Sequence, residues 1–204
     1  MLYLASQSPR RRELLQQIGV EFELVDGSVD ETPQWSESAA ELVCRLAQQK
    51  ARAGLAQLHK AGRVSAESPG SGPIVLGADT VVVIDTCILG KPEDELDAKS
   101  MLQRLAGRCH QVFSAVSICC NEQQHTELSI TDVYFRAIDS EELDRYCASG
   151  EPLGKAGAYA IQGLASVFVT RIEGSYSGVV GLPLEKLFPL LQAFGVPYWQ
   201  NGHR

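Results

Sequence analysis

The chain has 204 residues, of which 45% are hydrophobic and 21% are charged, and its formal net charge is −7. A chain of this length can bury roughly 70% of its unfolded surface, and the composition is that of a globular protein. The negative balance argues against nucleic acid or an anionic membrane surface as a partner, because proteins that bind these present a basic surface.

Apolar runs and cysteines exclude further classes. No apolar run approaches the length of a membrane span, and the first arginines follow a very short apolar segment, unlike those of a signal peptide. We therefore expect a cytoplasmic protein. Six cysteines without a C-x-x-C pair are too few for a disulfide scaffold, and the four histidines are scattered, so we expect buried thiols and no zinc site.

The first predicted elements are a short strand at residues 2–5 and a helix that begins at Pro9. Ser8 is a suitable N-cap, proline is favoured at the first helical position, and Gly19 is expected to end the helix. Arginines occupy residues 10–12 in the first turn, where helix N-termini favour acidic residues. They indicate either a phosphate group bound at the helix N-terminus or a solvated basic turn, and both interpretations stay open.

A strand at residues 20–24 and a long helix at residues 36–58 come next. The helix carries Lys50 on the same stripe as the small residues Ala47 and Gly54. A lysine on a core-facing stripe either extends its ammonium group to solvent, which is the commoner outcome, or meets a buried anion.

Residues 61–73 have the composition of a flexible surface loop. Residues 74–84 then form a β-rich run that is interrupted at residues 77–80. Such an apolar run is typical of a strand buried on both faces, so the carboxylate of Asp79 in its middle needs a charged partner or a metal ion. The alternative is an aspartate that caps backbone N–H groups at a bulge.

The rest of the chain alternates between strands and helices. We expect a short strand and turn at residues 87–92, a helix at 94–106, strands at 111–120 and 125–135, a helix capped by Ser140, a strand at 167–172, a small-residue turn at 174–178 and a last helix at 184–194. Glycines at positions 154, 157 and 163 permit close approach of the backbone to a ligand, and Lys155 adds a cation there.

Cations, a buried carboxylate and small-residue turns together indicate a site for phosphates. The cations are Arg10, Arg11, Lys50, Lys91 and Lys155. A nucleoside triphosphate carries about four negative charges, which proteins balance with arginine, lysine and a divalent ion. The chain has no P-loop, no dinucleotide-binding glycine motif and no nucleophile elbow, which counts against P-loop NTPases, dinucleotide-binding proteins and serine hydrolases.

Six motifs, in order along the chain, resemble those of the Maf family of nucleotide pyrophosphatases. They lie at Ser6 to Arg11, Gly77 to Val82, Gly90 to Pro92, Thr131 to Val133, Lys155 to Gly163 and Gly174 to Pro183. The resemblance covers nearly the whole chain. It implies an α/β fold in which residues 1–204 form one domain, with a mixed β-sheet, flanking helices and two lobes around a central cleft, akin to the inosine-triphosphate pyrophosphatases.

The resemblance also implies an activity: hydrolysis of dTTP, UTP and modified pyrimidine nucleotides to the monophosphate and pyrophosphate. A divalent cation, Mg²⁺ or Mn²⁺, would assist the attack of water at the α-phosphate. Asp79 matches the family's proposed general base and a metal ligand, and Glu31 is a second acidic candidate for the metal. The implied substrate-binding residues are Ser6, Ser8, Arg10, Arg11, Lys50, Thr80, Lys91, Lys155 and Gln162. A homodimer is an open expectation.

Three of these residues match positions associated with substrate choice in the subfamily that acts on dTTP and UTP: Arg10, Thr80 and Gln162. The sister subfamily, which acts on 7-methyl-GTP, differs around residues 159–162, so this segment favours pyrimidines. A glutamine amide can donate to O4 and accept from N3–H of uracil or thymine. A flipped amide would serve cytosine, and CTP therefore stays open.

The resemblance leaves one alternative function open, and the sequence departs from the family pattern at two positions. The alternative is a nucleotide-binding regulator of septum formation, in which the same site would bind a nucleotide without turnover. Gly154 stands where the family often has an acidic residue, and Gly178 stands where an asparagine is frequent. Each departure removes a polar contact that could order a loop or the metal.

Overall fold

The structure is a computed structural model that describes residues 1–62 and 72–200 of the chain. Most of the predicted loop at residues 61–73 therefore lies outside the described residues. The chain forms two compact units, each with its own internal contacts. The first consists of Met1–Asp79, Ser114–Leu128 and Gly181–Arg204, and the second of Thr80–Phe113 and Ser129–Val180.

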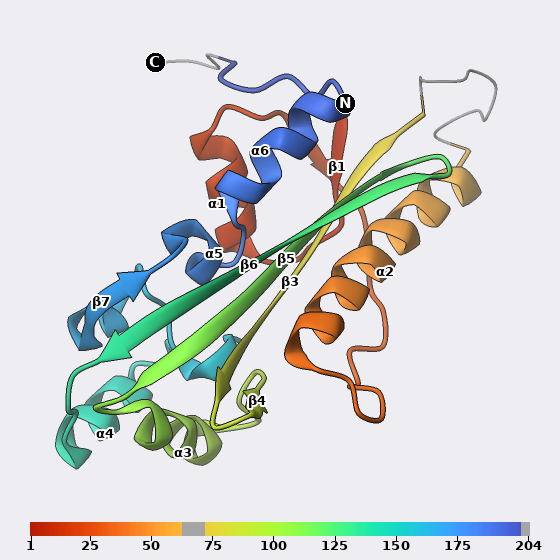
Figure 1. Cartoon of the computed structure of the whole chain (residues 1–204). Helices are drawn as coiled ribbons and strands as arrows, with labels where there is room; N and C mark the ends of the chain where they lie inside the picture. The colour runs from red at the N-terminus through yellow and green to blue at the C-terminus, as the bar shows by residue number, and fades with distance from the viewer. Residues whose placement is uncertain (63–71, 201–204) are drawn as a thin grey trace. The chain divides into compact units, whose positions relative to one another are not determined.

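A seven-stranded mixed sheet has the strand order β2-β1-β3-β5-β6-β7, with β4 paired to β3 (Figure 1). The strands are β1 (Leu2–Leu4), β2 (Phe22–Leu24), β3 (Ile74–Ile84), β4 (Cys87–Leu89), β5 (Cys109–Cys120), β6 (Gln123–Phe135) and β7 (Val169–Glu173). β1 pairs in parallel with both β2 and β3, whereas β4 and β7 pair antiparallel with their neighbours. The predicted α/β class with a mixed sheet is confirmed.

The first unit contains the helices α1 (Pro9–Gln17), α2 (Ala39–Lys60) and α6 (Leu184–Ala193). In Figure 1, α2 runs along one side of the strands, and α1 and α6 stand on the other. The apolar face of α2 packs into a core cluster formed by Ala5, Val25, Ala51, Leu55, Leu58, Val75 and Cys119. Among the described residues, no helix combines the length and the apolar character that crossing a membrane requires.

β3 is a single unbroken strand, so the predicted interruption at residues 77–80 is wrong. A Cβ atom at Gly77 would collide with the carbonyl oxygen of Ala47 and lie 2.6 Å from the backbone nitrogen of Ala51. α2 therefore runs against the backbone of β3. Side chains two residues apart on a strand share one face, so Asp79 points toward the same helix, where Lys50 lies.

The second unit contains α3 (Glu95–Leu105), α4 (Ser140–Ala148), α5 (Tyr176–Val180) and two short 3₁₀ segments, η1 (Ala156–Ala158) and η2 (Leu164–Phe168). α3 packs against both α4 and η1. The turn expected at residues 174–178 is wrong, because α5 begins there. The hydroxyl of Ser175 accepts from the N–H of Gly178 (3.0 Å) and so satisfies a donor of the first helical turn.

The N-cap of α4 is Asp139, so the prediction of Ser140 is wrong by one residue. The Asp139 carboxylate accepts from the backbone N–H of Glu142 (2.8 Å), and the Glu142 carboxylate accepts from the backbone N–H of Asp139 (3.2 Å). This reciprocal capping box satisfies two backbone N–H donors, and a helix capped by Ser140 would not have it.

The expectation that the cysteines are buried thiols is only partly right. All six are free, and Cys119 and Cys147 are buried. Cys87 and Cys109 are exposed, because each stands at the first position of its strand.

His110 is a buried polar side chain in the second unit, with 2% of its surface exposed. Its Nε2 atom lies 2.9 Å from the hydroxyl of Tyr159, and the rings of Tyr159 and Phe135 contact it edge to face. Nδ1 has no hydrogen-bond partner among the described residues. Burial lowers the pKa of His110 to about 4, so this imidazole is neutral at pH 7.

We expect His110 to make the fold sensitive to acid. Because its pKa is about 4 in the folded chain and about 6.5 when unfolded, the unfolded chain binds more protons between these values, and stability falls as the pH falls. From pH 7 to pH 5 the free energy of unfolding should lose about 2 kcal/mol through this residue. Urea unfolding at the two pH values measures this loss. For His110→Gln the loss of unfolding free energy should be smaller than that of the wild type by about 2 kcal/mol. The control His59→Gln, at an exposed site, should lose as much as the wild type. Equal losses in His110→Gln and the wild type would contradict the assignment.

Gly77→Ala should lower the free energy of unfolding by about 1–3 kcal/mol, because the added methyl group has to push α2 away from β3. Gly90→Ala is the matched control, since a Cβ atom there meets nothing within 4 Å. Urea unfolding at pH 7 measures both. Equal stability of the two variants would show that the close approach at Gly77 is not required.

Candidate active site

The first part of the site is the turn between β1 and α1. As predicted, Ser8 precedes the helix and Pro9 begins it, but the Ser8 side chain makes no capping hydrogen bond. The hydroxyl of Ser6 instead accepts from the backbone N–H of Ser8 (3.3 Å) and from Nη1 of Arg11 (3.1 Å). Nε of Arg11 donates to the carbonyl of Gly181 (2.8 Å). These contacts fix the direction of the Arg11 guanidinium.

The three arginines of α1 have different surroundings. Arg12 is half-buried and donates through Nη2 to the carbonyl of Gln7 (3.0 Å), while its Nε atom is buried with no hydrogen-bond partner among the described residues. Burial lowers the pKa of Arg11, the nearby Asp79 carboxylate raises it, and Arg10 lowers it further. Arg10 and Arg11 are thus close enough to interact with each other, and Arg11 with a buried carboxylate.

The second part of the site is a buried ion pair with a third, more exposed member. Nζ of Lys50 lies 2.7 Å from Oδ1 of Asp79 and 2.5 Å from Oε1 of Glu31. Lys50 and Asp79 are 8% and 7% exposed. The more common outcome expected for Lys50, extension to solvent, is therefore wrong, and so is the interpretation of Asp79 as a backbone cap at a bulge. The burial and the pairing of these two side chains follow from the close approach of α2 to β3.

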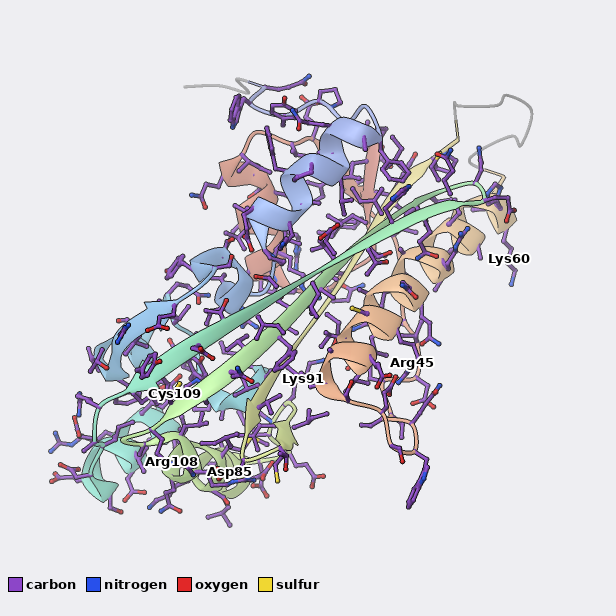
Figure 2. The ribbon with its side chains drawn as sticks, viewed as in Figure 1. Arg45, Lys60, Asp85, Lys91, Arg108 and Cys109 are labelled. Carbon is purple, nitrogen blue, oxygen red and sulfur yellow. The ribbon has the colours of Figure 1, made fainter. Side chains whose placement is uncertain are left out.

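Glu31 belongs to the loop between β2 and α2, and side-chain contacts fasten this loop. Asp30 accepts from the backbone N–H of Thr32 (2.9 Å), and the carbonyl of Thr32 accepts from Arg45 (3.2 Å). Arg45, labelled beside α2 in Figure 2, also binds Glu37 through two nitrogens (2.6 and 2.8 Å) and lowers the pKa of that carboxyl to about 2. α2 thus holds the segment that presents Glu31 to Lys50.

Asp79 and Glu31 fit a divalent cation through the chemistry of their donor atoms. Oxygen ligands are those that Mg²⁺ and Mn²⁺ prefer, and Mg²⁺ is usually held by one or two carboxylates together with phosphate oxygens and water. The two carboxylate oxygens converge on Lys50 Nζ, so they can be no farther apart than the sum of their two distances to it. Within residues 1–62 and 72–200, no group of three or more His, Cys, Asp or Glu side chains could hold a metal.

Four predicted site residues belong to the second unit, namely Thr80, Lys91, Lys155 and Gln162. Lys91 is exposed just after β4 (Figure 2), and Gln162 is exposed as well. Nζ of Lys155 donates to the carbonyls of Glu151 (2.5 Å) and Leu153 (3.5 Å), which are contacts within its own loop. The structure thus brings Ser6, Arg11, Lys50, Asp79 and Glu31 together in the first unit.

Gly181 contacts a predicted site residue, Arg11, although the sequence did not indicate such a role for it. It lies in the last of the six motifs, but its role is to offer a backbone carbonyl to Arg11, and such a role leaves no side-chain signal. Gly154, one of the two departures, has a φ of +73°, which lies in the left-handed region that glycine adopts readily.

Comparison with known proteins places the chain among close relatives. The family model described as Maf-like protein matches residues 1–194. A protein of Saccharophagus degradans is 50% identical over 98% of this chain and 91% of its own length. Relatives from Photobacterium profundum and Vibrio parahaemolyticus are 48% and 50% identical, each over 95% of this chain and 96% of the relative. All three are named dTTP/UTP pyrophosphatase.

Lys50→Met should lower the free energy of unfolding by about 3 kcal/mol at pH 7, because it leaves the buried Asp79 carboxylate without its ammonium partner. The double variant Lys50→Met/Asp79→Asn should lose less, since the isolated charge is gone. Urea unfolding measures both.

Lys99→Met is the matched control, because Lys99 pairs with an exposed carboxylate, that of Asp144. It should change stability by less than about 1 kcal/mol. An equally small loss of unfolding free energy in Lys50→Met would contradict the expectation that the buried Asp79 carboxylate needs its ammonium partner.

Proposed function

We propose that this chain, which belongs to the Maf family, hydrolyses dTTP and UTP to the nucleoside monophosphate and pyrophosphate. The names of relatives that share about half of its residues over nearly the whole chain support the reaction and the substrates. The observation that carries the proposal is the buried Asp79 carboxylate, held by Lys50 and next to Arg11. Such a cluster of cations around a carboxylate suits a polyphosphate and an attacking water.

Asp79 would act as the general base. Its carboxylate would accept a proton from the water that attacks the α-phosphorus, and the contact with Lys50 fixes the position of that carboxylate. Arg11, oriented by Gly181 and Ser6, would bind phosphate oxygens. It would stabilise the negative charge that develops on the pyrophosphate as it leaves. Arg10 would add a second guanidinium at the start of α1.

A divalent ion would be held by Asp79 and Glu31, and it would neutralise phosphate charge and polarise the attacking water. Mg²⁺ and Mn²⁺ are the ions that we propose, because both accept all-oxygen ligands. Lys50 contacts the same two carboxylates and limits their mutual repulsion.

The remaining assignments rest on the family resemblance. We propose that Ser6, Ser8, Lys50, Lys91 and Lys155 contribute to phosphate binding, and that Arg10, Thr80 and Gln162 contribute to substrate choice. Modified pyrimidine nucleotides are included as substrates. We also propose that residues 1–204 form one domain of this family, and that the protein acts in the cytoplasm as a homodimer.

Release of pyrophosphate from dTTP and UTP in the presence of Mg²⁺ or Mn²⁺ tests the function. Asp79→Asn should lower kcat by about a hundredfold or more, because the amide cannot accept the proton, while the nucleotide still binds. Equilibrium binding of UTP to the same variant shows that the site is intact.

Asp144→Asn is the matched control, since Asp144 is an exposed carboxylate whose partner is Lys99. It should leave kcat unchanged. Near-normal turnover in Asp79→Asn would remove this residue as the base. Binding of UTP by the wild type without any release of pyrophosphate would favour the alternative of a nucleotide-binding regulator of septum formation.

A further inference from the structure

Gln162 lies in a tight turn of the second unit. The backbone N–H of Gly163 donates to the carbonyl of Ala160 (3.0 Å), which places Ile161 and Gln162 at the two central positions of the turn. Tyr159, Ala160 and Ile161 are buried, whereas Gln162 is exposed. The direction of the Gln162 side chain therefore depends on what holds the two ends of this turn.

The start of the turn is fixed by Tyr159. Its hydroxyl lies 2.9 Å from Nε2 of the buried His110, and its ring packs edge to face against Phe135. Among the described residues this is the hydrogen bond that joins the polar tip of Tyr159 to the core.

The end of the turn is fixed by the carboxylate of Glu151. Oε2 accepts from the backbone N–H of Leu164 (3.0 Å), and Oε1 accepts from the backbone N–H of Ala165 (3.2 Å). These two N–H groups are the first donors of η2, and a carboxylate at that place also interacts favourably with their dipoles. Both oxygens of Glu151 are thus used, one for each donor.

The same carboxylate is tied to α4. The hydroxyl of Tyr146 donates to Oε1 of Glu151 (3.0 Å), and burial together with this carboxylate raises the pKa of Tyr146, so the hydroxyl keeps its proton. The ring of Tyr146 packs edge to face against Phe168 at the end of η2. Gly163 completes the arrangement, because a Cβ atom there would collide with the Glu151 carboxylate. The backbone after Gln162 therefore lies directly against Glu151.

We propose that Glu151 is a positioning residue for base recognition: with Tyr146, it sets the direction in which Gln162 presents its amide to the pyrimidine. The proposal rests on the proposed function only for the role of Gln162. A structural role alone would affect every ligand of the protein equally. A positioning role affects the base and leaves the phosphates unchanged.

The test compares UTP with ribose 5-triphosphate, which has the phosphates and the sugar but no base. Dissociation constants are measured with Mg²⁺ in the Asp79→Asn background, where turnover is suppressed. Glu151→Gln should weaken UTP binding about tenfold, the equivalent of one hydrogen bond, because an amide presents an NH₂ group to one of the two backbone donors. Binding of ribose 5-triphosphate should not change. In the active enzyme the same substitution should raise KM for UTP and leave kcat unchanged.

Three further variants sharpen the test. Tyr146→Phe keeps the ring and removes one donor to Glu151, so it should show the same effect in smaller degree. Gln162→Ala should weaken UTP binding selectively, and Glu151→Gln should add nothing in that background, because it acts through Gln162. Glu141→Gln is the matched control, since this exposed glutamate on α4 pairs with the exposed Arg145 on the same helix, and the variant should bind both ligands as the parent does.

Several outcomes would overturn the proposal. One is an equal loss of affinity for UTP and ribose 5-triphosphate in Glu151→Gln, and another is full additivity with Gln162→Ala. If Glu151→Gln does not fold, Tyr146→Phe decides by the same comparison. Failure of the proposed function can be distinguished from failure of this proposal. The first would appear as an absence of pyrophosphate release by the wild type. The second would appear in the comparison of UTP with ribose 5-triphosphate binding, which does not require turnover.

Discussion

The geometry of the site depends on one buried ion pair, that between Lys50 of α2 and Asp79 of β3. Removing two charges from water is unfavourable unless their attraction and further contacts offset it, so a well-packed apolar pair would serve stability as well or better. The pair forms because Gly77 lets α2 approach the strand backbone, and because the alternation of the strand turns Asp79 to the same face. The geometry that lets the helix pack closely therefore also holds the Asp79 carboxylate in place, as its proposed role as general base would require.

Local chemistry allowed much of the fold to be predicted. Proline after a serine marked the start of α1, apolar runs marked the long strands, and Gly19 marked the end of α1. The errors arose where two local solutions compete. Asp139 and Ser140 are both acceptable caps, and only the reciprocal contact with Glu142 decides between them. Small residues at 174–178 suggested a turn, whereas the Ser175 hydroxyl provides a helix start.

The site was harder to predict than the fold, because its contacts join residues far apart in the chain. The sequence indicated that Asp79 needs a partner and that Lys50 lies on a core-facing stripe, but periodicity within one element cannot say that the two meet. Nor could it separate the three arginines of α1. Arg11 is oriented by the carbonyl of Gly181, and a backbone acceptor 170 positions away leaves no trace in composition or spacing.

Backbone groups and fixed carboxylates do the positioning in both units. In the first, a carbonyl and a serine hydroxyl orient Arg11, and a loop fastened by Arg45 presents Glu31. In the second, Glu151 binds two consecutive backbone N–H groups after Gln162. Side chains that would touch the substrate are thereby held by neighbours that would not. Since a misplacement of about 1 Å can reduce a rate by about a hundredfold, the proposed reaction would depend on these supporting residues as well as on the groups that contact the nucleotide.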